Sequence, residues 1–184
     1  VRLENRPQSS RWYPGAGLYR NVRLVTTERV HVPVWGTQLT TPHVSAEYAS
    51  VRLRTTIRNA GDADVRISTD IIAPDGKIVA RKDNSRKINH GQPFEQNFLI
   101  NAPSLWSPET PYLYKAVSKI YVDGKQTDEY TTRFGIRSIE IIADKGFFLN
   151  GKHRKFQGVC NHHDLGPLGA AVNVAALRRQ LTLL

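Results

Sequence analysis

The chain has 184 residues, of which 40% are hydrophobic, and it carries a single cysteine and a formal net charge of +10. This hydrophobic share is typical of a globular protein with a core. One cysteine excludes an intrachain disulfide framework and a Cys-rich zinc site. No apolar run reaches the roughly 18 residues of a membrane-spanning helix, so we expect no membrane partner.

The basic excess raises the question of nucleic-acid binding, which depends on where the charges lie. Residues 1–60 carry nine Lys and Arg against three Asp and Glu, whereas residues 61–120 carry eight against seven. Many arginines of the first third alternate with apolar residues, which is typical of the solvated face of a sheet. We therefore expect no nucleic-acid partner.

The first segment, residues 1–36, mixes turn-forming residues with aromatic ones, among them Trp12 and Tyr13. Apolar alternation predicts a strand over 20–26 and a second over 30–35. Because proline cannot donate to a sheet ladder, Pro33 places the second strand at an edge or in a linker. We interpret this segment as the end of a preceding domain followed by a linker.

The next segment, residues 37–137, is predicted to be a β domain. A clean period-two pattern runs over 49–58, as a half-buried strand requires. The side chains predicted to share its inner face are Val51, Leu53, Thr55 and Ile57. Further strands are predicted over 65–71, 77–82, 94–100, 112–122 and 127–134. Turn signals separate these strands and no helical spacing interrupts them, which favours an immunoglobulin-like β-sandwich.

The last segment, residues 138–184, changes character. Short strands are predicted over 138–143, 147–149 and 154–159. Helical spacing follows over 172–184, where Asn173 is the expected N-cap. The apolar stripe of this helix consists of Val174, Leu177, Leu181 and Leu184. Strands followed by a polar loop and a helix are how a βα unit of a catalytic barrel begins, so we expect a truncated start of a (β/α)8 barrel.

The polar loop contains His162, His163 and Asp164, the one cluster with catalytic residue types. A metal site is disfavoured because adjacent side chains rarely aim at one ion and no third ligand follows at a usual spacing. A nucleophile served by a His/Asp pair is disfavoured because no nucleophile elbow is visible. Hydrogen bonding to a polyhydroxylated ligand is easier to satisfy. The alternative is a loop held by its own hydrogen bonds, with no ligand.

The acidic residues lie mostly in turns, and no two of them form a matched acid and base. These residues are Asp62, Asp64, Asp75, Asp123 and Asp144. Glycoside hydrolysis would need two carboxylates flanking the bond. Trp106 could stack on a sugar ring, but we favour packing between a sheet and a loop.

Several motifs together resemble the family 2 glycoside hydrolases, most closely the bacterial β-galactosidases. They are 10–22, 105–114, 133–137, 148–152 and 158–169. The resemblance implies that residues 1–36 end a sugar-binding jelly roll and that residues 37–137 form the immunoglobulin-like domain. It also implies that residues 138–184 enter the (β/α)8 barrel, which would make the chain an internal fragment of the enzyme.

The resemblance implies retaining hydrolysis of terminal non-reducing β-D-galactose by two glutamates, one the acid/base and the other the nucleophile. Both are expected after Leu184, so this chain would hold no catalytic residue and would be an inactive structural spacer. His162 and Asp164 match the substrate-binding positions of the barrel-entry motif. Cys160 and His163 depart from it, because the family often has Asn and Glu there.

The sequence is compatible with other hypotheses. The parent enzyme could act on β-glucuronides or β-mannosides, or the sandwich could itself be a carbohydrate-binding module. Some members of the family use Mg2+ or Na+, but no metal site is expected in this chain. Many members are homo-oligomers, which the resemblance extends to the parent. The parent is expected to be a soluble bacterial protein, and its compartment stays open between periplasm and cytoplasm.

Overall fold

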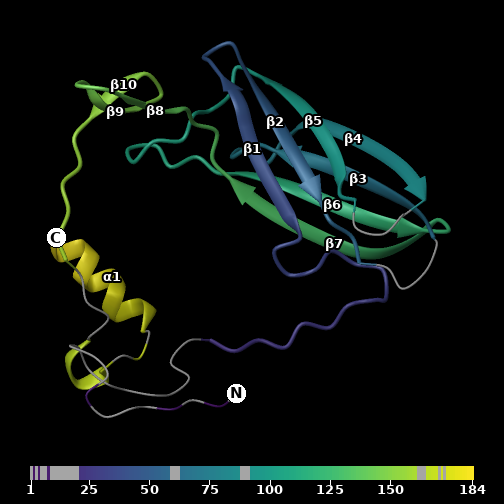
Figure 1. Cartoon of the computed structure of the whole chain (residues 1–184), viewed down its shortest axis with the longest axis horizontal. Helices are drawn as coiled ribbons and strands as arrows, with labels where there is room; N and C mark the ends of the chain where they lie inside the picture. The colour runs from purple at the N-terminus through teal and green to yellow at the C-terminus, as the bar shows by residue number, and fades with distance from the viewer. Residues whose placement is uncertain are drawn as a thin grey trace. The chain divides into compact units, whose positions relative to one another are not determined.

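The computed structural model describes residues 2, 4, 8, 21–58, 63–87, 92–160, 165–169, 171 and 173–184. The strands of the larger part are β1 (Thr37–Val44), β2 (Tyr48–Thr55), β3 (Asp64–Ile72), β4 (Ile78–Lys87), β5 (Phe94–Asn101), β6 (Tyr114–Val122) and β7 (Lys125–Phe134). They are followed by β8 (Ile139–Ile142), β9 (Gly146–Leu149), β10 (Lys152–Arg154), a short 3-10 helix (Gly166–Leu168) and α1 (Val174–Leu183), as Figure 1 shows.

The first seven strands form a two-sheet sandwich. One sheet has the order β1-β2-β5 and the other the order β4-β3-β6-β7, with every pairing antiparallel. In Figure 1 the three-stranded sheet lies in front of the four-stranded one. The chain changes sheet after β2, β4 and β5, so neither sheet forms from consecutive strands alone. The prediction of a mainly β chain built on an immunoglobulin-like sandwich is confirmed.

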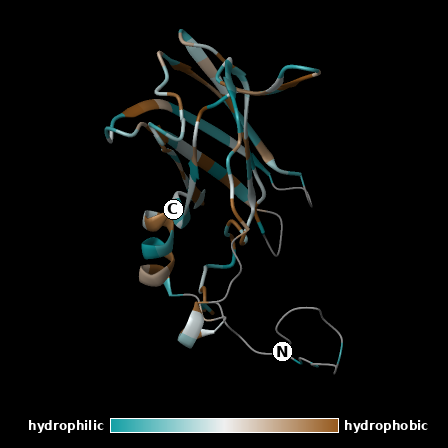
Figure 2. Cartoon of the chain, turned by 90° about the vertical axis from the view of Figure 1, so that its left-hand side faces the viewer, coloured by the Kyte–Doolittle hydropathy of each residue, from teal (hydrophilic) through white to brown (hydrophobic). Residues whose placement is uncertain are grey.

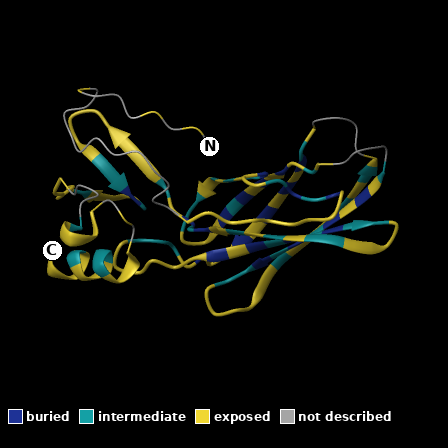
Figure 3. Ribbon diagram, turned by 90° about the horizontal axis from the view of Figure 1, so that it is seen from below, coloured by how far each residue is buried: buried dark blue, intermediate teal, exposed yellow. Residues whose placement is uncertain are grey.

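The core follows from the period-two alternation of the strands, which is visible as alternating bands in Figures 2 and 3. One apolar cluster joins Val51 and Leu53 of β2 to Phe98 of β5 and Ala116 of β6. A second cluster gathers around Ile67 near the other end of the strands. The two clusters contain side chains from both sheets, which is what holds the sheets face to face.

A buried polar layer separates these two apolar clusters. The Thr69 hydroxyl donates to Gln96 Oε1 at 2.7 Å and lies 2.9 Å from Ser118 Oγ. Since the single hydroxyl proton of Thr69 goes to Gln96, Ser118 is the donor in the second bond. The Gln96 amide donates to the Lys82 carbonyl oxygen and to Asn84 Oδ1, both at 3.1 Å, and so ties β5 to β4.

An edge strand of one sheet is also joined to an edge strand of the other. Thr37 of β1 and Thr132 of β7 share a hydroxyl–hydroxyl hydrogen bond of 2.9 Å. The sequence prediction missed β1, because its residues are mostly polar and it contains Pro42. The pairing of β1 with β2 shifts between Thr40 and His43, so Pro42 lies at an irregularity of an edge strand, where proline is tolerated.

The two strands predicted before residue 37 are not present as such. Residues 21–30 have no strand, and His31 forms only an isolated bridge with Arg58. Val30 and Val32 are buried against the second apolar cluster, and the Val32 N–H donates to Asp128 at 2.8 Å. Val22, Leu24 and Val25 of the first predicted strand are exposed. Apolar alternation was therefore only a partial signal of burial, and it did not mark strand pairing, which needs a neighbouring strand as well.

The strands β8, β9 and β10 form a separate antiparallel sheet. Asn150 and Gly151 connect β9 to β10 with φ of 50° and 72°, the left-handed values of a two-residue type I′ hairpin. This short turn fixes the third strand at Lys152–Arg154. The predicted strand over 154–159 is therefore wrong, because residues 155–159 lie beyond the pairing.

Contacts divide the chain into two compact units, residues 26–156 and a second unit of residues 1–25 with 157–184. The predicted domain boundaries at 36/37 and 137/138 stay predictions. In the second unit the N-cap prediction is confirmed, because Asn173 Oδ1 accepts from the Ala176 N–H at 3.0 Å. None of the described residues of α1 is buried.

Candidate functional site

The predicted substrate-binding residues, His162 and Asp164, lie outside the described residues, as does His163. Their role therefore stays a prediction from sequence. Cys160 is described and is a free, exposed thiol. After the loop, the Leu165 N–H donates to the Gly169 carbonyl oxygen at 2.9 Å and closes a single turn.

Within residues 26–156, three of the motifs quoted above meet at one place. The Trp106 N–H donates to the Ile136 carbonyl oxygen at 2.8 Å, and the Arg137 guanidinium lies 4.9 Å from the centroid of the Trp106 ring. A Cβ added at Gly135 would lie 2.8 Å from the Trp106 Cβ, closer than real contacts allow. The indole therefore packs against the chain leaving β7, and only glycine fits at position 135.

Asn150 joins the small sheet to this tryptophan loop. Its Nδ2 group donates to the Trp106 carbonyl oxygen at 3.0 Å, and its Oδ1 accepts from the Ser138 N–H at 3.0 Å. Its own N–H donates to the Ser138 carbonyl oxygen, also at 3.0 Å. The Asn-Gly turn signal in the sequence predicted only the hairpin. The side chain adds contacts with residues 12 and 44 positions away.

A two-pronged ion pair links the same two segments. Arg154 of β10 donates through Nη1 and Nη2 to the two carboxylate oxygens of Glu109, at 2.6 and 2.8 Å. Hydrogen bonds from Arg154, a backbone N–H and Ser107 lower the pKa of Glu109 from its usual 4.5 to about 2. Sequence reasoning missed this pair, because no periodic pattern connects residues 45 positions apart.

We call Trp106, Glu109, Arg137, Asn150 and Arg154 the joint. The contacts of these residues link two segments of the chain and do not form a catalytic site. Glu109 is ionised at neutral pH and both of its oxygens are occupied, so it cannot deliver a proton as a general acid must. The described residues contain no cluster of three or more His, Cys, Asp or Glu side chains placed to hold a metal ion.

The aromatic side chains that could stack on a sugar fall into three groups. Trp106 is partly buried in the joint, in agreement with packing. Trp12 and Tyr13 lie outside the described residues. Trp35, which no sequence pattern singles out, has 91% of its surface exposed. Its signal lies in its backbone, where φ is 58°, and not in any sequence pattern.

The sandwich matches a known protein family. A family model described as glycosyl hydrolases family 2 matches residues 32–137, which include all seven strands of the sandwich. The chain belongs to this family. The resemblance inferred from the motifs is thereby confirmed, and the family 2 model also includes Trp106, Glu109 and Arg137 of the joint.

Individual relatives extend the family 2 match beyond the sandwich. A β-galactosidase of Bacteroides ovatus, BoGH2A, is 43% identical over 189 aligned residues, covering 100% of this chain and 22% of the relative. A β-glucuronidase of Bacteroides fragilis is 32% identical over 165 residues, covering 85% of this chain and 24% of the relative. A crystal structure of a β-glycosidase from Bacteroides vulgatus superposes with a TM-score of 0.84 at 32% identity, covering 94% of this chain and 22% of that one.

The chain therefore spans about a fifth of the length of these family 2 proteins. The two curated relatives differ in the sugar that their names specify, so the family is decided but the substrate is not. Among the described residues, no helix combines the length and apolar character that crossing a membrane requires.

Proposed function

We propose that this chain is the non-catalytic sandwich and joint of a retaining exo-glycosidase that removes terminal non-reducing β-D-galactose. The observation that carries the proposal is the 43% identity to a β-galactosidase over the whole of this chain. At that level of identity, a shared fold and a shared place within a family 2 enzyme are the natural inference. Mg2+ or Na+ dependence and a homo-oligomer are further proposals for the whole protein.

The role proposed for the segment itself is structural. Retaining hydrolysis needs two carboxylates about 5 Å apart, one as acid/base and one as nucleophile. The single glutamate of the joint, Glu109, is held by Arg154 instead. We propose that both catalytic glutamates lie beyond Leu184 and that the joint holds the sandwich and the small sheet in one geometry.

His162 and Asp164 are proposed to contact the sugar, as their match to the family's barrel-entry motif implies. In the whole protein, His162→Ala should raise KM for a β-galactoside or lower kcat/KM, because a lost hydrogen bond weakens binding of both substrate and transition state. The matched control is His163→Ala, at the neighbouring position that departs from the motif. Equal effects of the two changes would contradict the assignment.

A second candidate is a β-glucuronidase, which the 32% identity to such an enzyme from Bacteroides fragilis favours. The two candidates separate in one assay of the whole protein with the p-nitrophenyl β-D-galactoside, β-D-glucuronide and β-D-mannoside. The expected result is the highest kcat/KM for the galactoside. A higher value for the glucuronide would replace the first proposal with the second.

The inactivity of the segment needs its own experiment. The purified 184-residue chain is incubated with p-nitrophenyl β-D-galactoside, and release of nitrophenol is compared with buffer alone. We expect no release above buffer, because removing a catalytic carboxylate abolishes the chemical step. Hydrolysis that co-purifies with the chain and is lost on its removal by immunodepletion would overturn the structural role.

A further inference from the structure

Trp35 occupies an unusual position in a tight turn. The Gly36 N–H donates to the Pro33 carbonyl oxygen at 2.8 Å, which closes a four-residue turn with Trp35 as its third residue. The φ of Trp35 is 58°, in the left-handed region. Turns that need a positive φ at this position normally have glycine or asparagine there, because a bulky side chain is strained. Backbone strain of this kind clusters at functional sites.

The turn is held firmly, so this conformation is built into the fold. A Cβ added at Gly36 would lie 2.7 Å from the Pro33 carbonyl oxygen, which leaves glycine as the only residue that fits. The Thr56 N–H donates to the Gly36 carbonyl oxygen at 2.7 Å and ties the turn to the strap of residues after β2. Val32, just before the turn, is 3% exposed.

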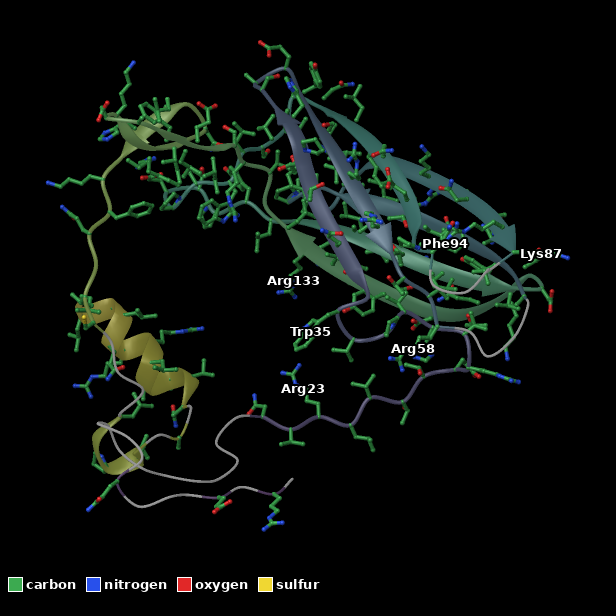
Figure 4. All side chains as sticks on the ribbon, viewed as in Figure 1. Arg23, Trp35, Arg58, Lys87, Phe94 and Arg133 are labelled. Atoms are coloured by element: carbon green, nitrogen blue, oxygen red, sulfur yellow. The ribbon has the colours of Figure 1, made fainter. Side chains whose placement is uncertain are left out.

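The result is a rigid backbone that presents a free indole. The Trp35 side chain, labelled in Figure 4, projects outward from the turn and is 91% exposed. A tryptophan side chain that stays exposed contributes no burial free energy to the folded state. The strained φ is unfavourable to folding and the exposed indole contributes nothing to it. A ligand that covers the ring would give both features a function.

Polar side chains surround the ring. Trp35 borders a depression of about 210 Å3, together with Gln38, Arg54, Thr56 and Pro93. Gln38 and Arg54 are paired in the register of β1 and β2, so they share the outer face of that sheet. The pairing of Arg54 with Glu95, at 3.8 Å, uses Nε. The Nη1 and Nη2 nitrogens of Arg54 have no hydrogen-bond partner among the described residues.

We propose that this depression binds a pyranose ring of a neutral oligosaccharide. One face of such a ring carries C–H groups, which suit the electron-rich face of the indole. Its hydroxyls suit the amide of Gln38, the guanidinium of Arg54 and the hydroxyl of Thr56, since each can donate a hydrogen bond. Glu95 lies 3.7 Å from Nε of Arg52 and 3.8 Å from Nε of Arg54 and offsets part of their charge, which favours a neutral sugar over a polyanion.

A protein partner is the less favoured occupant. Tryptophan anchors of protein interfaces are surrounded by a desolvated, well-packed patch. Here the side chains of Gln38, Arg54 and Thr56 in the depression carry an amide, a guanidinium and a hydroxyl, and a protein partner would have to strip water from all three. The inference does not rest on the proposed enzyme activity, because it concerns binding by the 184-residue chain alone.

The test is a titration of the 15N-labelled chain with β-1,4-galactotetraose, cellotetraose and xylotetraose, each to 20 mM. The readouts are the indole N–H resonance of Trp35, assigned from the Trp35→Ala variant, and the backbone amide resonance of Thr56, which lines the depression and is present in every variant. We expect a saturable shift with at least one probe and a dissociation constant in the millimolar range. Trp35→Ala should weaken binding at least tenfold, whereas Gln38→Ala should weaken it about two- to fivefold, as loss of an exposed polar contact does.

Tyr112→Ala is the matched control, because Tyr112 is also an exposed aromatic residue, 45% accessible, and does not line the depression. It should bind the probe as the unmodified chain does. Three results would overturn the proposal: no shift with any probe, binding that survives Trp35→Ala, or a Trp35 resonance that moves on dilution without sugar. The last would identify Trp35 as a contact between protein chains. Thermal melts of each variant exclude loss of the fold as the cause.

Discussion

The side chain of Asn150 donates a hydrogen bond of 3.0 Å to the carbonyl oxygen of Trp106, 44 residues earlier in the chain. The same amide accepts from the N–H of Ser138. A turn residue thus joins the small sheet to the loop before β6. Position 150 needs a left-handed φ as well as an amide, and asparagine is the residue that provides both.

Asn150→Ala should loosen the small sheet. The change removes two hydrogen bonds, each contributing about 1 kcal/mol, and forces alanine into the left-handed region at a further cost of about 1 kcal/mol. We expect the free energy of opening β8–β10 to fall by about 3 kcal/mol in total. Hydrogen exchange of the β9 amides measures this opening.

Asn150→Gly separates the two causes. Glycine adopts the left-handed φ without strain, so only the side-chain hydrogen bonds are lost and a decrease of about 2 kcal/mol is expected. If the alanine and glycine variants exchange at equal rates, backbone conformation is not a factor at this turn. If both variants exchange like the unmodified chain, the side-chain hydrogen bonds of Asn150 do not stabilise the small sheet.

The Glu109–Arg154 pair predicts a pH dependence of the joint. Because the folded pKa of Glu109 is lowered to about 2 from 4.5, the pair stabilises the fold above pH 4.5. That stabilisation is lost as the pH falls from about 4.5 through about 2. The 13C resonance of the Glu109 carboxyl, followed between these limits, should report the low pKa directly.

Arg154→Gln is the control for that titration. It removes the largest cause of the lowered pKa and leaves the hydrogen bonds from the backbone and Ser107. The pKa of Glu109 should therefore rise toward 4.5 without reaching it. An unchanged carboxyl titration in this variant would mean that the ion pair is not formed in solution.

Replacing threonine by valine should change the free energy of unfolding in opposite directions at two buried positions of the sandwich. Thr69→Val leaves Gln96 Oε1 without its donor and should lower the free energy of unfolding by about 2 kcal/mol. Thr55 Oγ1 is buried with no hydrogen-bond partner among the described residues. Thr55→Val removes this unsatisfied hydroxyl and should raise the free energy of unfolding by about 1 kcal/mol.

Urea denaturation of both variants measures these changes. A Ser118→Ala variant, alone and with Thr69→Val, extends the test to the polar layer, where the two effects should not add because the side chains share a hydrogen bond. A loss of stability on Thr55→Val would show that its hydroxyl has a partner in solution, such as a buried water.

Trp35→Asn should stabilise the chain. Asparagine tolerates a left-handed φ, and the exposed indole makes no packing contribution that its removal would forfeit. The free energy of unfolding should rise by about 1 kcal/mol, the lower end of the roughly 1 to 3 kcal/mol that backbone strain costs at one residue. A decrease measured by urea denaturation would mean that the indole packs onto the fold in solution.

Much of the sandwich was predictable because burial in strands leaves a period-two signature. Val51 and Leu53 were expected to face the core and do so. The signature has two weaknesses, which residues 21–26 and β1 illustrate. Alternation can mark a chain that is buried or exposed without pairing, and a polar edge strand such as β1 pairs through its backbone with little apolar alternation.

The joint was beyond sequence reasoning for a different reason. The motifs containing Trp106, Gly135 and Asn150 were recognised, but nothing in their spacing says that they meet in space. Long-range side-chain bonds depend on where the chain returns after β7, which only the assembled fold determines. His162 and Asp164 stay predictions, because they lie outside the described residues.

The two kinds of sheet edge have unequal consequences for self-association. β1 carries Pro42 and an irregular register, features that stop another strand from pairing along an edge. β8 is also an edge strand, and it exposes Ile139, Ile141 and Ile142 with no proline between them. In a concentrated solution of the separate chain, intermolecular β-pairing should therefore involve β8 rather than β1. A lysine at Ile141, the most exposed of the three at 83%, is the change that would keep such a solution clear.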